Sequence, residues 1–160
     1  MKLQSPLSIE LVDQLRRVPD VPPIVVESEL YLDGATDVVL RLNDLMVNCI
    51  QGPADLTVSV RSKHDSDWSA VPYVYAYFEK LNDADALDKI LNTRGLIVWF
   101  VAHFHDVYRL FCDPSDANKK AEFLRFQELT HKDWLHSKLE KLKSLSPSEW
   151  RSIGPGGSRR

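Results

Sequence analysis

The segment from Leu56 to Arg61 constrains the fold most, because its side chains alternate between apolar and polar. Leu56, Val58 and Val60 point to one side of an extended chain, while the polar residues between them point to the other side. This period of two is typical of a strand in a sheet that is covered on one face only. The rest of the chain therefore has to supply further strands and the helices that cover the apolar face.

Two β-branched runs ahead of this segment supply further strands. Residues 24–32 end at Asp33-Gly34, a dipeptide that favours a tight turn, and residues 36–42 return from it. Residues 45–50 either extend the second strand or form a separate one. Together with the alternating segment, these runs predict an antiparallel meander, in which each strand pairs with its neighbour in sequence.

Helix signals stand before and after the predicted strands. Ser5 and Pro6 favour the start of a first helix, and Pro72 suits the first turn of a second, aromatic helix. The longest helix begins near Pro114 and runs to about Ser144, and its weaker middle leaves open a kink or a break. Its apolar positions are Leu124, Leu135, Leu139, Leu142 and Leu145, joined by Phe123, Phe126 and Trp134 over a wider arc. The predicted fold class is α+β, an antiparallel sheet flanked by helices, with a long C-terminal helix.

The most apolar run of the chain, residues 96–104, lacks the polar face of an amphipathic helix. It mixes β-branched and aromatic residues, so we interpret it as a central strand that turns near His103 into a further strand at 107–111. A buried helix is the alternative interpretation. Before this run, a short helix is expected to begin near residue 82 and to end at Gly95.

The bulk properties indicate one domain without covalent cross-links. With 160 residues and 44% hydrophobic content, the chain is long enough to bury a core of its own. We expect a single globular domain over residues 1–152 and a flexible tail at 153–160. Cys49 and Cys112 are the only cysteines, which excludes a disulfide framework and favours a reducing compartment.

Charge and hydropathy exclude several kinds of partner. The net charge of −3 gives no general attraction to nucleic acid or to anionic lipid, so such binding would need a local patch. The longest unbroken apolar run, residues 96–102, is far below the roughly 20 residues that cross a bilayer, and the first residues lack the apolar stretch of a signal peptide. We therefore expect a protein that is neither transmembrane nor secreted.

A charged loop at residues 62–69 holds the first candidate interaction residues. Trp68 has no local apolar partner there, so it either folds back onto the domain or anchors an interface. Asp65 and Asp67 have the spacing of a carboxylate pair, but the glycine and the distal glutamate of a calcium loop are missing, so no metal is expected. The full set of candidate interaction residues is Asp65, Asp67, Trp68, Lys119, Lys120, Arg159 and Arg160.

His103, His105 and Asp106 form the one cluster that invites a metal hypothesis. Alternate histidines on a strand point to the same face and could both bind zinc, but two ligands are not a site. The sequence also lacks a nucleophile elbow and a phosphate-binding glycine motif. We therefore expect no catalytic residues, no cofactor and no metal, with a metal-dependent hydrolase as a remote alternative.

The central block, about residues 55–98, resembles that of rhabdovirus matrix proteins, especially the vesiculovirus kind. The matching pieces are Leu56-Thr57, a short acidic loop, Ala70-Val71-Pro72, Phe78 after an aromatic turn, an acidic helix of roughly ten residues, and Gly95-Leu96-Ile97-Val98. Their order and spacing agree over under a third of the chain. The family's fold is a single α+β domain, in agreement with the patterns described above.

The resemblance implies a structural protein of the virion and the host cytoplasm without catalytic residues. Such a protein associates with itself, condenses the viral ribonucleoprotein and links it to the inner face of the membrane without spanning it. Sequence-specific binding to nucleic acid is not expected. The chain departs from animal members of the family because it lacks their Lys-rich N-terminal arm, and its proline segment at residues 21–24 lacks the tyrosine of their budding motifs. A small intracellular adaptor that binds a partner through its C-terminal helix is the alternative.

Overall fold

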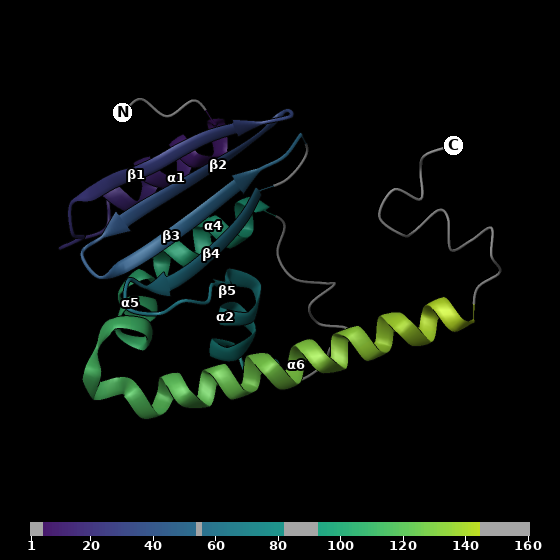
Figure 1. Cartoon of the computed structure of the whole chain (residues 1–160). Helices are drawn as coiled ribbons and strands as arrows, with labels where there is room; N and C mark the ends of the chain where they lie inside the picture. The colour runs from purple at the N-terminus through teal and green to yellow at the C-terminus, as the bar shows by residue number, and fades with distance from the viewer. Residues whose placement is uncertain (1–4, 54–55, 82–92, 145–160) are drawn as a thin grey trace.

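A computed structural model of the chain describes residues 5–53, 56–81 and 93–144. Within these ranges the strands are β1 (Ile24–Leu32), β2 (Ala35–Leu42), β3 (Leu45–Gln51), β4 (Leu56–Ser62) and β5 (Ser69–Ala70). The helices are α1 (Pro6–Arg16), α2 (Val71–Phe78), α4 (Thr93–Ala102), α5 (Phe104–Cys112) and α6 (Ala117–Lys143), with a short 3-10 helix, η1 (Pro114–Asp116), ahead of α6. The predicted α+β fold class is confirmed, including the long C-terminal helix (Figure 1).

The strands form one antiparallel sheet in the order β1-β2-β3-β4-β5, so each strand pairs with its neighbour in sequence. The turn between β1 and β2 has positive φ angles at both Asp33 (46°) and Gly34 (82°), the backbone that an Asp-Gly turn favours. A second turn, with a positive φ of 54° at Asn43, separates β3 from β2. The predicted meander is confirmed, and β3 is a strand of its own.

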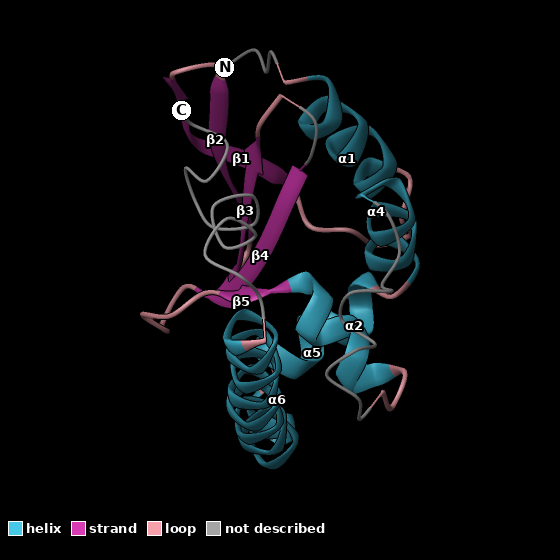
Figure 2. Ribbon diagram, turned by 90° about the vertical axis from the view of Figure 1, so that its right-hand side faces the viewer, coloured by secondary structure: helices cyan, strands magenta, loops and turns pink. Residues whose placement is uncertain are grey.

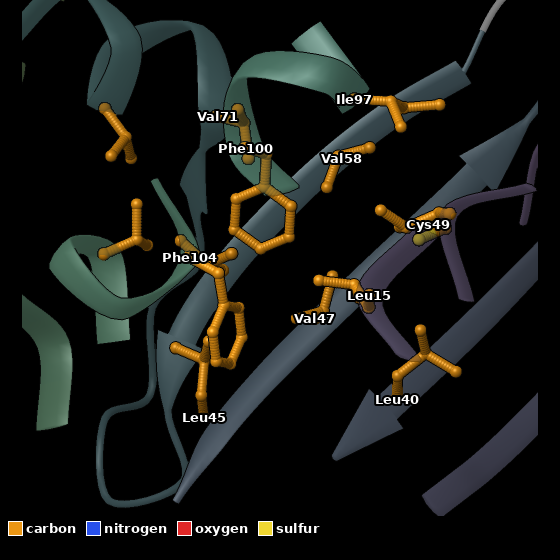
Figure 3. Packing of buried hydrophobic residues seen from close by; sticks show 14 of the residues in the cluster. Leu15, Leu40, Leu45, Val47, Cys49, Val58, Val71, Ile97, Phe100 and Phe104 are labelled. Atoms are coloured by element: carbon orange, nitrogen blue, oxygen red, sulfur yellow. The ribbon is translucent and has the colours of Figure 1, made fainter. Parts of the chain in front are cut away.

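One face of the sheet carries the core. Val38, Cys49 and Val58 lie side by side on β2, β3 and β4, and all three are buried. Figure 2 shows α1 and α4 on this side of the sheet, and Figure 3 shows Phe100 and Phe104 directed toward its strands. In the part of the chain that the structure describes, no helix covers the opposite face, as the alternation in β4 predicts.

The apolar run at residues 96–104 is not a strand, so our first interpretation was wrong and the buried helix is correct. Ile97 and Phe100 of α4 are buried in the core beneath the sheet, while Trp99 packs edge-on against Tyr75 of α2, with ring centroids 5.3 Å apart. α4 therefore packs on two sides at once. A helix in this position does not need a continuous polar face, which is why the helical period is absent from its sequence.

Neighbouring predictions change with this correction. Gly95 lies inside α4 and does not end a helix, and residues 107–111 belong to α5, not to a hairpin strand. The short helix expected to begin near residue 82 lies largely outside the described residues. The boundary between the domain at 1–152 and the tail at 153–160 lies outside them as well.

α6 is one unbroken helix, without the kink left open near Thr130. Phe123 anchors it: this fully buried ring lies between Tyr77 of α2 and Phe111 of α5, with centroid distances of 5.4 and 5.6 Å. Figure 1 shows that the helix then runs along the body and extends past it. Among the described residues, no helix is both long and apolar enough to cross a membrane.

Both thiols are expected to react slowly in the folded protein. Burial raises the pKa of Cys49 and of Cys112 from 9.0 to about 12, with Asp37 and Asp44 adding smaller repulsive contributions to the respective thiolates. A higher pKa lowers the thiolate fraction at pH 8, and a shift of this size lowers it about 1000-fold relative to the unfolded chain. Titration with a thiol reagent at pH 8, with and without denaturant, checks this. One thiol that reacts natively at the denatured rate would contradict the placement of Cys112, which is the less buried of the two.

Candidate interaction surface

Two of the predicted interaction residues, Asp65 and Lys120, contact each other. The Lys120 Nζ lies 2.6 Å from the Asp65 Oδ2 and also donates to the carbonyl oxygen of Phe111 at 3.3 Å. This ion pair is partly shielded from solvent and joins the loop between β4 and β5 to the first turns of α6. The two charges therefore bond to each other across this junction.

Trp68 takes a position between the two alternatives that the sequence left open. Its side chain is 36% exposed, and the guanidinium carbon of Arg61 lies 4.7 Å from the centre of its ring. The ring borders an open hollow of about 410 Å³, whose lining residues are Ser59, Trp68, Ala70, Tyr73, Gln127, Glu128 and His131. Trp68 is thus neither buried nor isolated, and it stands at the junction of the sheet edge, α2 and α6.

The remaining predicted residues are dispersed. Asp67 is exposed in the same loop as Trp68. Lys119 borders a second hollow, of about 510 Å³, between α2 and α6, and the other lining residues are Tyr77, Phe78, Lys80, Glu122 and Phe126. Arg159 and Arg160 lie outside the described residues. The predicted set therefore does not converge on one site.

A polar contact fixes the middle of α6 to the body. The hydroxyl of Tyr73 on α2 lies 2.7 Å from the Nδ1 of His131, and the His131 ring stacks at 6.0 Å on Trp134, one turn further along. The ammonium group of Lys138 lies 5.5 Å from the centre of the Trp134 ring. With the Phe123 anchor, this contact fixes the direction in which α6 leaves the body.

A stripe of leucines on α6 lies on a different face from Phe123, and the contact of His131 with Tyr73 lies at one edge of this face. At about 100° per residue, Leu124, Leu135 and Leu142 lie within about 20° of one another around the helix axis, and Leu139 lies about 60° from Leu124. Leu124, Leu135 and Leu139 are exposed. The anchoring residue Phe123 lies on a face about 100° away. We call Leu124, Leu135, Leu139 and Leu142 the leucine stripe.

Charges of both signs lie around this stripe, and Glu128 lies within it, between Leu135 and Leu139 around the helix axis. Lys132 and Lys143 lie on one of its flanks and Lys138 on the other, whereas Asp133 and Glu140 lie on the opposite side of the helix. In the linear sequence these charges alternate in sign. The helical arrangement places Lys132, Lys138 and Lys143 beside the leucines of the stripe.

His103, His105 and Asp106 do not converge, and the strand geometry assumed for them is wrong. His103 separates α4 from α5 and stacks on the Trp99 ring, whereas the Nε2 of His105 contacts the carbonyl oxygen of Pro19 at 2.7 Å. Asp106 forms an ion pair with Arg109, three residues further along α5. Each of the three side chains is therefore directed to a different part of the fold.

The surface of the described residues carries exposed apolar side chains and open hollows. Within residues 5–53, 56–81 and 93–144, there is no group of three or more histidine, cysteine, aspartate or glutamate side chains that could hold a metal ion. The leucine stripe and the hollow beside Trp68 lie on this surface, and Leu30 and Leu32 at the end of β1 are exposed as well. Comparisons with protein-family models, with curated proteins and with solved structures found no match to this chain.

Proposed function

We propose that this chain is a non-catalytic structural protein that assembles by self-association. In its specific form, it is a viral matrix protein of the rhabdovirus kind, which bridges the ribonucleoprotein to the inner face of the host membrane. The observation that carries the proposal is the exposed leucine stripe on a helix that extends past the body (Figure 1). The resemblance of residues 55–98 to the matrix family supports the same conclusion.

Burial of the leucine stripe would contribute the free energy expected of a weak and reversible interface. Complete burial of a leucine side chain contributes about 1.5 to 3 kcal/mol, so covering these half-exposed leucines contributes on the order of 1 kcal/mol each. Leucines gathered on one helix face, rimmed by charged groups, are typical of a protein interaction site. A contact of this strength allows a structural protein to be stored as monomers and to assemble when its concentration rises.

A second copy of the chain is the partner that the helix fits most directly, because both faces of the contact are then the same leucine stripe. The adaptor alternative uses the same stripe to bind a different protein. The two functions differ in one observable property. A matrix protein grows into larger species as its concentration increases, whereas an adaptor stays monomeric in the absence of its partner.

The test measures light scattering against protein concentration and salt for the natural chain and two variants. Leu135→Asp places a charge in the stripe, and Leu129→Asp places the same charge on another face of α6, where the leucine is 52% exposed against 42% for Leu135. We expect reversible, salt-sensitive growth for the natural chain, a loss of at least about tenfold in apparent affinity for Leu135→Asp, and little change for Leu129→Asp.

A natural chain that stays monomeric at high concentration would remove the proposal and favour the adaptor. Co-sedimentation with purified viral ribonucleoprotein and with vesicles of phosphatidylcholine and phosphatidylserine tests the matrix form specifically. We expect peripheral binding to both. Assembly without binding to either would leave a self-associating protein of another kind and would remove the matrix assignment.

A further inference from the structure

We infer that β1 pairs with β1 of a second copy in antiparallel orientation, with the two Leu30 residues opposite each other at the two-fold axis. The inference rests on the proposed self-association and adds a second contact to it. A single two-fold contact through the leucine stripe closes a dimer, because both copies then use the same surface for each other. Growth into larger species therefore needs a second contact on another part of the chain.

β1 is the edge strand of the sheet. Among the described residues it pairs with β2 only, so its other edge carries backbone N–H and C=O groups without a strand partner. Leu30, Tyr31 and Leu32 are three consecutive large side chains, and they are 54%, 52% and 63% exposed. An exposed and apolar edge strand is a template for pairing with another chain. Figure 1 shows β1 at one end of the molecule and α6 at the other, so both contacts can form at once.

The two halves of β1 differ in how they are protected from such pairing. A β-bulge lies between Val26 and Ser28, and Glu27 at the bulge forms an ion pair with Arg41 of β2. Bulges and charged side chains are the features by which edge strands avoid further pairing. Beyond the bulge, Glu29 is the one charged side chain of the strand. The contact is therefore confined to residues 28–32.

The turn after β1 sets which backbone groups of this segment face outward. Leu32 and Ala35 flank the two-residue turn and pair with each other, so the backbone groups of Leu32 and Leu30 are directed toward β2. Those of Glu29 and Tyr31 are directed toward the free edge, because successive residues of a strand bond to opposite sides. With Leu30 at the axis, Glu29 of each copy lies opposite Tyr31 of the other, and each such pair exchanges both of its backbone hydrogen bonds.

Side-chain charges select this register. With Leu30 at the axis, each Glu29 carboxylate faces a Tyr31 phenol across the contact, and Asp33 lies opposite the bulge at Glu27, where the strand bends away. An axis at Glu29 would place the two Glu29 carboxylates against each other, and an axis at Tyr31 would place Glu29 against Asp33. Like charges directly opposite each other on neighbouring strands are destabilising.

The phenol and the carboxylate already bond to each other within one chain. A side-chain hydrogen bond joins Tyr31 to Glu29. The carboxylate has two oxygens, so it accepts from a second phenol without losing the first. The pairing of two copies therefore extends a contact that the single chain makes, and it buries Leu30 against its own copy.

Cysteine cross-linking in the full-length chain tests the register. Leu30→Cys protein is oxidised mildly with diamide at concentrations at which the natural chain assembles, and the products are separated on a non-reducing gel. We expect a disulfide-linked dimer, because the two copies of residue 30 are direct neighbours across the axis. Leu32→Cys is the matched control on the same face of β1. Its two copies would lie about 14 Å apart along the strands, so it should not cross-link.

Charged substitutions at the axis give a second measurement by sedimentation velocity. Leu30→Lys and Leu30→Glu should each stop growth at the dimer that the leucine stripe forms, because like charges meet at the axis. An equimolar mixture of the two should restore growth, because opposite charges then meet. Val25→Lys, on the same face of β1 but before the bulge, is the control and should grow like the natural chain. Circular dichroism confirms that each variant is folded.

The variants separate this contact from the leucine stripe. Leu135→Asp should leave dimers that form through β1, and its combination with Leu30→Lys should leave monomers. If the natural chain grows but Leu30→Lys grows equally, or Leu32→Cys cross-links in place of Leu30→Cys, the inference is wrong and the proposed function stands. If the natural chain stops at a dimer that Leu30→Lys abolishes, the β1 contact stands and the proposed function fails. A natural chain that neither grows nor cross-links through Leu30→Cys removes both.

Discussion

Replacement of Phe123 with alanine is expected to lower the free energy of unfolding by about 3 to 5 kcal/mol and to loosen α6 from the body. The Phe123 ring is fully buried, and it contacts Tyr77 from α2 and Phe111 from α5 in edge-to-face geometry. Its removal would leave a cavity at the place where three helices meet. Chemical denaturation followed by far-UV circular dichroism measures the loss, and hydrogen exchange of the α6 amides measures the loosening.

Leu129→Ala is the matched control for this prediction. It removes a similar amount of side chain from the same helix, but Leu129 is largely exposed, so the expected loss is below about 0.5 kcal/mol. If Phe123→Ala stayed within about 1 kcal/mol of the natural chain, the anchor would have to lie elsewhere along α6. The contact between Tyr73 and His131 would then be the next candidate.

The second large effect is expected from a substitution at Val58 on β4, and the adjacent Thr57 provides the control. Val58→Asp should prevent folding or cost more than about 4 kcal/mol, because it buries a carboxylate beside Cys49 on the helix-covered face of the sheet. Thr57→Asp makes the same charge one residue earlier, on the exposed face opposite Ile50, and should change the free energy of unfolding by less than about 1 kcal/mol. Thermal melting of the two variants provides the comparison.

Equal effects at the two positions would contradict the one-sided sheet. If both variants failed to fold, the face that carries Thr57 would have to be covered as well. If both folded normally, the face that carries Val58 could not be the core. The two variants therefore test whether the sheet is covered on one face only. They carry the same substitution at neighbouring positions, whose side chains point to opposite faces.

The sheet could be predicted from the sequence because its signals are local. Three local signals specify the meander, and each acts within a few residues. They are the alternation in β4, the Asp33-Gly34 turn and the β-branched runs that precede β4. α4 could not be predicted in the same way, because packing on two sides removed the polar face that distinguishes a helix from a buried strand. The assignment of that run depends on tertiary packing and not on its own pattern.

For the predicted interaction residues, too, the sequence carries the local signals but not the contacts that depend on tertiary packing. Asp65 and Lys120 are 55 positions apart in sequence, so no local pattern could show that they bond to each other. Trp68 has no local apolar partner in the sequence, and its contact with Arg61 depends on how the loop returns to the sheet. The leucine stripe was present in the sequence, but the aromatic anchors of α6 widened the apparent apolar arc. The stripe can be distinguished from the anchoring face of α6 only when the position of the body is known.

The strictly sequential order of the strands has a consequence for biosynthesis. β1 to β4 pair only along the order of the chain, so they can form their hairpins while the ribosome is still producing the later residues. α6 is made after every strand of the described sheet, and its anchors on α2 and α5 already exist when it emerges. Among the described elements, the helix that carries the leucine stripe is therefore made after the sheet, so a chain that has completed only the sheet does not yet expose the stripe.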